Sequence, residues 1–229
     1  INGGVNLEKL PMIFPLTLLT ATAYSIFYYV ISQGEIALTG TINAMYPLAT
    51  IILARLFLGE TTSGLQNLGI MATLAGAVLI AWPKNVKVKL ESWVWWGAAG
   101  AIMAGSGDFL TKLIIGKSDV YTFTLSHELA FIPVMAGLWW ADKGGRSVPR
   151  LQLKSWWPTL VGVGMLQMGV LSFYIALSLG KASLVAPISS AYQAITVILA
   201  VLLLKERVSK RQIGGIIATV MGMMLIAYK

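Results

Sequence analysis

Four ionisable side chains stand inside apolar stretches of this sequence, where such groups are rare. Glu128 and His127 lie in one stretch, and Asp108 and Lys112 lie in another. Burying an unpaired charge costs several kcal/mol unless it faces a cavity or a partner, so these positions are the first candidates for a site. Glu128 lies near the middle of its stretch and is suited to carry a proton or a cation. Its alternative role is a structural hydrogen bond to a neighbouring helix.

The other three ionisable groups have competing explanations. His127 is adjacent to Glu128 and therefore about 100° away around a helix, so only one of the two can face a cavity squarely. His127 either handles protons or packs in the interior. Asp108 and Lys112 stand four residues apart on one helix face, where they most simply neutralise each other. A metal centre is not expected, since the sequence has one His and no Cys.

A second group of candidates consists of tyrosines and small polar residues within apolar stretches. We expect them to line a solute pathway, although such side chains also hydrogen-bond between helices for stability. The candidates of this group are Tyr28, Asn43, Tyr46, Tyr174, Ser189, Tyr192 and Gln193, and Thr41, Ser190, Tyr24 and Gln167 belong to the same group.

The elements that must position these residues are membrane-spanning helices. Hydrophobic residues make up 57% of the chain, charged residues 11%, and the mean hydropathy is +0.76. Soluble domains carry about 25% charged residues. A bilayer core needs about 20 consecutive apolar residues. The sequence predicts an all-α integral membrane protein with about eight spans, at residues 11–33, 36–54, 61–83, 93–115, 120–141, 156–180, 182–204 and 212–228.

The sequence repeats itself at an offset of 146 residues. Residues 27–81 align without a gap with residues 173–227 and share 24 identities in 55 positions. Tyr46 and Tyr192 are matched in this alignment. Glu60 and Glu206 are matched as well; each ends a span, and we expect each to pair with loop cations or with free backbone amides at the start of the next helix.

Matching positions are separated by five helices, so the two copies must cross the membrane in opposite directions. Inverted repeats of this kind are typical of secondary transporters, in which a central site opens to each side in turn. Residues 93–229 would form a complete five-helix copy, and residues 1–92 the last three helices of the other. A ten-helix, 5+5 bundle is therefore predicted, whose first two helices would precede Ile1.

These paired segments resemble the EamA-like ten-helix transporters of the drug/metabolite transporter superfamily. The resemblance rests on GEIALTGTINAMYPLATIILARLFLGE and GKASLVAPISSAYQAITVILAVLLLKE, and on the helices LGIMATLAGAVLIA and GGIIATVMGMMLIA that follow them. It implies a basket of helices around a central cavity that carries small polar or amphipathic metabolites, commonly outward. His127 and Glu128 are not part of the family pattern.

The distribution of basic residues predicts an orientation. The segments 84–89, 143–154 and 205–211 hold eleven of the seventeen Lys and Arg residues, and would lie on one side of the membrane. The positive-inside rule puts that side in the cytoplasm, with both ends of this chain outside. Family members usually keep both termini in the cytoplasm, so the two criteria disagree. We expect a multi-pass protein of the plasma membrane.

Three functional classes follow from these patterns. The first is a secondary transporter, an exporter of small metabolites, amino acids or drugs, coupled to protons through Glu128. The second is a truncated subunit or assembly partner that does not transport. A membrane-embedded enzyme is the third, but the chain has no HExxH motif and no nucleotide-binding loop. The expected partners are a small-molecule substrate and membrane lipids, without nucleic acid or cofactor, and the internal duplication favours a monomer.

Overall fold

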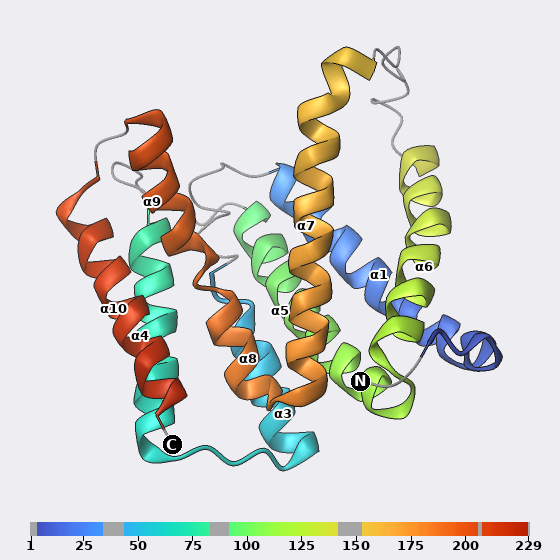
Figure 1. The fold of residues 1–229 in the computed structure, drawn as a ribbon, viewed down its shortest axis with the longest axis horizontal. Coiled ribbons are helices and arrows are strands. Elements are labelled where there is room, and N and C mark those ends of the chain that lie inside the picture. Colours follow the sequence, from blue (N-terminus) through green and yellow to red (C-terminus); the bar gives the residue numbers. More distant parts are fainter. Residues whose placement is uncertain (1–3, 34–43, 83–91, 142–152, 206–207, 229) are drawn as a thin grey trace. The chain divides into compact units, whose positions relative to one another are not determined.

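The described part of the chain is helical. This computed structural model describes residues 4–33, 44–82, 92–141, 153–205 and 208–228. They form a short 3-10 helix, Leu7–Lys9, and the α-helices labelled in Figure 1, with no strand among the described residues. The helices are α1 (Leu10–Gln33), α3 (Pro47–Leu58), α4 (Gly64–Ala81), α5 (Ser92–Lys117), α6 (Val120–Ala141), α7 (Leu153–Leu179), α8 (Ala182–Ser189), α9 (Tyr192–Leu204) and α10 (Lys210–Ala227).

Four described segments are long and apolar enough to cross a membrane. They are Gly64–Ala81, Gly97–Lys117, Trp156–Leu179 and Ala182–Leu199, and Pro47–Leu58 is a shorter apolar helix. The prediction of an all-helical membrane protein is thus confirmed. The number of eight spans and the ten-helix repeat remain predictions.

The helices separate into two compact units. Ile1–Ser25 and Leu110–Leu179 form one, which we call the α6–α7 unit. Ile26–Phe109 and Gly180–Lys229 form the other, which we call the α4–α10 unit. Each unit combines segments that are distant in sequence, so each is assembled by tertiary packing rather than by local chain order.

Turns lie beside two helices of the α4–α10 unit. α8 ends at Ser189, a turn follows, and α9 begins at Tyr192. Turn residues also precede α3, whose first residue is Pro47. The missing amide of proline costs nothing at the first helical position. Discontinuous helices of this kind form the substrate sites of many transporters.

α4 and α10 have the same bounds at the repeat offset of 146 residues and begin with the same cap. The Ser63 hydroxyl accepts a hydrogen bond from the Gln66 amide nitrogen, and the Gln66 side chain accepts one from the Ser63 amide. Ser209 and Gln212 repeat this capping box in α10. Each box satisfies backbone amides that the first turn leaves free.

Glycines set the distance between α4 and α10, which lie side by side (Figure 1). A Cβ atom at Gly69 would lie 2.6 Å from the Gly222 carbonyl oxygen, and one at Gly76 would lie 2.6 Å from the Gly215 carbonyl oxygen. The buried hydroxyl of Thr73 donates to the Gly69 carbonyl. Small residues allow helix backbones to approach closely within a membrane, where packing drives association.

Glu60 joins the end of α3 to the start of α8. Its carboxylate accepts hydrogen bonds from the Ala182 and Ser183 amides, at 2.8 and 2.9 Å, and from the Ser183 hydroxyl at 2.6 Å. The Lys181 ammonium donates to the Thr61 carbonyl. Glu60 therefore does cap free backbone amides, but those of α8 and not of the next helix, α4, which caps itself. Glu206 lies outside the described residues.

Polar contacts also connect the segments of the α6–α7 unit. The Thr17 and Ser126 hydroxyls lie 2.8 Å apart and tie α1 to α6 in the buried interior. The Lys112 ammonium, on the last turns of α5, donates to the Leu177 carbonyl of α7. These contacts hold α6 and α7 in the positions from which they present the candidate site.

Candidate functional site

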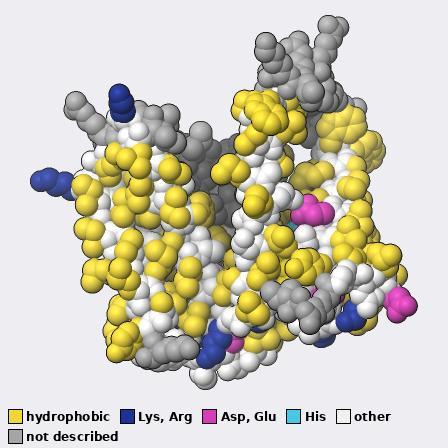
Figure 2. All heavy atoms as spheres, in the orientation of Figure 1, with side chains coloured by type: hydrophobic (Ala, Val, Ile, Leu, Met, Phe, Trp, Pro, Cys, Tyr) yellow, Lys and Arg dark blue, Asp and Glu magenta, His cyan; other side chains and the backbone are white. Residues whose placement is uncertain are grey.

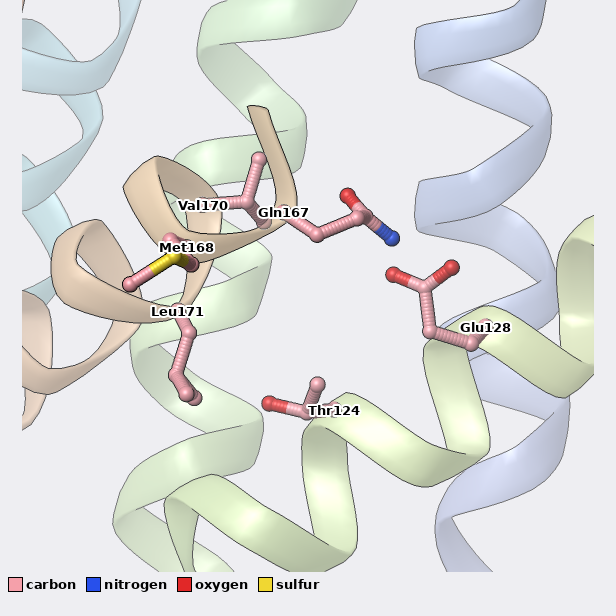
Figure 3. Close-up of a pocket in the computed structure, with 6 residues that line it drawn as sticks. All are labelled: Thr124, Glu128, Gln167, Met168, Val170 and Leu171. Atoms are coloured by element: carbon pink, nitrogen blue, oxygen red, sulfur yellow. The ribbon is translucent and has the colours of Figure 1, made fainter. Parts of the chain in front are cut away.

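The carboxylate of Glu128 points into a pocket between α6 and α7. Thr124, one turn before Glu128 on α6, also lines the pocket, and α7 contributes Gln167. Figure 3 shows the Glu128 carboxylate and the Gln167 amide turned toward one another across the pocket. The Thr124 hydroxyl donates to the Val120 carbonyl of its own helix at 2.7 Å. Three polar side chains from two helices therefore line one pocket, and two of them, Glu128 and Gln167, face each other.

The rest of the pocket is apolar. Met168, Val170 and Leu171 of α7 complete the lining, and the cavity measures about 250 Å³. The side chain of Glu128 is partly buried, whereas that of Gln167 is not covered by other parts of this chain. A carboxylate and an amide beside aliphatic walls can bind a small solute that has a hydrogen-bonding or cationic end and an apolar body. Pockets for drug-sized ligands run from about 300 to 1,000 Å³, so this one suits a smaller molecule.

His127 faces a different environment. It is 2% exposed and lies among aromatic rings: Phe123 stacks on it with centroids 5.3 Å apart, and Phe131 meets it edge-on at 4.9 Å. The Tyr174 hydroxyl lies 3.3 Å from His127 Nδ1, while Nε2 has no hydrogen-bond partner among the described residues. His127 and Tyr174 thus join α6 to α7, and neither lines the pocket at Glu128.

Further candidates meet at the turn before α3 and the end of α8, in the α4–α10 unit. The Tyr46 hydroxyl lies 3.0 Å from the Ser189 hydroxyl, which joins the turn before α3 to the last residue of α8. Tyr46 also lies against α5: a Cβ atom at Gly105 would lie only 2.3 Å from the Tyr46 carbonyl oxygen. This contact requires glycine at position 105.

Asp108 is buried beside the same turn. It is 2% exposed, and the Thr50 hydroxyl of α3 lies 3.5 Å from its carboxylate. Thr50 also donates to the Gly105 carbonyl at 2.9 Å. Asp108 thus belongs to the contact between α3 and α5 in the α4–α10 unit. The Lys112 ammonium donates to the Leu177 carbonyl of the α6–α7 unit, and the pairing of Lys112 with Asp108 stays a prediction.

The remaining candidates from the sequence are not among the described residues that line the pocket at Glu128. Tyr192, which matches Tyr46 in the repeat, is 45% exposed. Gln193 is buried, and its side-chain oxygen has no hydrogen-bond partner among the described residues. Asn43 and the side chain of Tyr28 lie outside the described part of the chain.

Two residues that share these sites were not selected from the sequence. Thr124 stands four positions before Glu128, and that spacing alone could have placed both on one helix face. Thr50 gave no such signal, because its contact with Asp108 depends on how α3 packs against α5. No three His, Asp or Glu side chains of the described residues lie close enough together to hold a metal ion.

Comparison with known proteins finds a matching family and two proteins of similar sequence. The sequence pattern of the EamA-like transporter family matches residues 2–82 and 91–228. An uncharacterized protein of Methanocaldococcus jannaschii is 28% identical over 131 residues, which cover 57% of this chain and 93% of that protein. An uncharacterized transporter of Synechocystis is 32% identical over 76 residues, 33% of this chain and 23% of its own length.

The fold also matches a solved structure. A protein of known crystal structure aligns with a TM-score of 0.77 over 94% of this chain and 75% of its own, with 14% identical residues. At that identity the match shows a shared fold alone.

Proposed function

This chain belongs to the EamA-like transporter family, and from that premise we propose that it exports a small metabolite, amino acid or drug by alternating access. Members of the family are membrane transporters rather than enzymes, and the chain is accordingly a multi-pass membrane protein. The identity of the solute, the direction of transport and its coupling are parts of the proposal, as is the plasma membrane as its location.

One observation carries the proposal: Glu128, Thr124 and Gln167 converge on a single small pocket. Glu128 accepts hydrogen bonds from the polar end of the solute, or balances its positive charge. Gln167 offers one acceptor and two donors beside it. Met168 and Leu171 contact the apolar part of the solute. Ionisable residues of membrane spans mark such solute and proton pathways.

Glu128 also supplies the coupling in this proposal. A carboxylate binds either a proton or a cationic group, and a proton arriving from one side of the membrane displaces the solute. Gln at this position would keep the shape and, with one acceptor oxygen and one donor group, would resemble the protonated carboxyl group, but it could not exchange a proton. Solute exchange and proton-driven accumulation can therefore be separated experimentally.

The test is counterflow and pH-driven uptake of radiolabelled amino acids and small metabolites into proteoliposomes. Glu128→Gln should retain counterflow and lose accumulation driven by a pH gradient. Glu8→Gln, a carboxylate variant at an exposed position near the start of the chain, is the matched control and should accumulate solute like the unmodified protein. Full accumulation by Glu128→Gln would refute the coupling role. Failure of every form to exchange any solute would instead favour the assembly partner that does not transport.

A further inference from the structure

A second pocket, in the α4–α10 unit, has apolar side chains at every described residue that lines it. It lies between α9 and α10, measures about 270 Å³, and is formed by Ile198, Val201, Leu202, Val208, Ile213, Ile216 and Ile217. A cavity of this size has room for part of a hydrocarbon chain. None of these described residues has a polar side chain that could orient a polar solute, so their lining differs in kind from that of the pocket at Glu128.

The first copy of the repeat has polar residues at the matching places. Arg55, Thr62 and Asn67 stand 146 positions before Val201, Val208 and Ile213. They bond to one another: the Arg55 guanidinium donates to Thr62 at 3.0 Å and to Asn67 at 2.5 Å, and the Thr62 hydroxyl donates to Asn67 at 2.6 Å. The second copy thus has apolar residues at the three positions where the first has a hydrogen-bonded cluster.

The same end of the second copy is basic. Lys205 follows α9, Lys210 begins α10, and both are exposed, with Val208 of the pocket between them in sequence. The matching residues of the first copy are Gly59 and Gly64. Figure 2 shows basic side chains projecting at the end where α9 leads into α10, above a mainly hydrophobic face.

Lys205 occupies a backbone conformation that favours glycine. Its φ is 55°, and the matching Gly59 has a φ of 63°. A side chain in the left-handed region costs about 1–2 kcal/mol relative to the right-handed one, and glycine avoids that cost. The second copy therefore has a lysine in a left-handed turn. Glycine, the matching residue of the first copy, adopts the same backbone conformation at lower cost.

We propose that the pocket between α9 and α10 binds an acyl chain of an anionic phospholipid, whose phosphate lies against Lys205 and Lys210. The apolar lining excludes polar ligands, and the chain spans a lipid bilayer, so acyl chains are present at this surface. Anionic headgroups complement the basic end of the pocket. Basic pockets between membrane helices bind such headgroups on the cytoplasmic side, where the distribution of Lys and Arg also places residues 205–211.

The test measures binding of phosphatidylglycerol and phosphatidylcholine to the purified protein in detergent by native mass spectrometry. Phosphatidylglycerol should bind selectively. Lys205→Gly should lower its affinity about fivefold, the usual contribution of one basic residue at an anionic surface, without lowering the thermal midpoint of unfolding. Lys117→Gln, at an exposed lysine of α5, is the matched control and should bind phosphatidylglycerol like the unmodified protein.

A second variant separates a seated lipid from general charge attraction. Val201→Arg, Val208→Thr and Ile213→Asn together transfer the polar cluster of the first copy into the pocket. Because this change adds a positive charge, attraction to the surface alone predicts tighter binding of phosphatidylglycerol, whereas an acyl chain in the pocket predicts loss of binding. Equal binding of the two lipids, unchanged affinity of Lys205→Gly, or tighter binding by the triple variant would each overturn the proposal.

Discussion

Replacing Gly215 by alanine should destabilise the pairing of α4 and α10. The new Cβ atom would lie 2.8 Å from the Gly76 carbonyl oxygen, 2.8 Å from Ile80 Cγ1 and 3.0 Å from the Ile80 amide nitrogen. Ordinary contacts to carbon begin at about 3.5 Å, so the helices would have to separate by roughly 0.5 Å or more. A gap of that size already forfeits about a quarter of the dispersion energy of neighbouring contacts.

The expected cost is about 1–3 kcal/mol, the range for inserting a methyl group into a packed interior. Alanine's better helix propensity offsets at most about 1 kcal/mol of it. The neighbouring Gly214 supplies the matched control, since a Cβ atom there meets nothing within 4 Å. Gly214→Ala should be neutral or slightly stabilising.

The assay is thermal unfolding of the purified variants in the same detergent. A net cost of about 2 kcal/mol corresponds to a midpoint lowered by about 4–8 °C for a chain of this length. If Gly215→Ala unfolded at the same temperature as Gly214→Ala, the close backbone approach would not exist in the folded protein, and the reasoning would be refuted.

Two smaller perturbations test other contacts of the α4–α10 unit by the same unfolding measurement. Glu60→Gln replaces one charged acceptor at the start of α8 by an amide donor and should cost about 1–3 kcal/mol; an unchanged midpoint would show that the carboxylate does not hold α8. Tyr46→Phe removes the hydroxyl contact with Ser189 and should cost only about 0.6 kcal/mol, the average of hydrogen bonds measured between membrane helices. Ser189 retains its bond to the Ala186 carbonyl, so a loss of several kcal/mol would contradict a local effect.

The positions of the helices could be predicted from the sequence because apolar length is a local property. The stretch 61–83 contains α4, and the Ser63 and Gln66 pattern marks where that helix begins. The turn between α8 and α9 could not be predicted in this way. Residues 182–204 contain no charged side chain and have the length of one span, although Ser189, Ser190 and Gln193 make the sequence less apolar around the break.

Contacts between helices were harder to infer than the helices themselves. The sequence placed Glu60 at a helix end with a capping role, but local spacing favoured the nearest helix, whereas packing brings α8 to it. For Glu128 the sequence identified the residue and the conflict with His127. It could not say which of them faces a pocket, because that depends on where Gln167, 39 positions further along the chain, comes to lie.

The reciprocal glycine contacts of α4 and α10 have a consequence for how the chain could be divided. α4 ends at Ala81 and belongs to the first half of the sequence, whereas α10 closes the second half. Glu60 adds a polar contact from the first half to α8 of the second. These noncovalent contacts bridge residues 4–82 and the later part of the chain. The peptide connection between residues 82 and 92 is therefore not the sole attachment of the two halves, and they carry the complementary surfaces of a split protein.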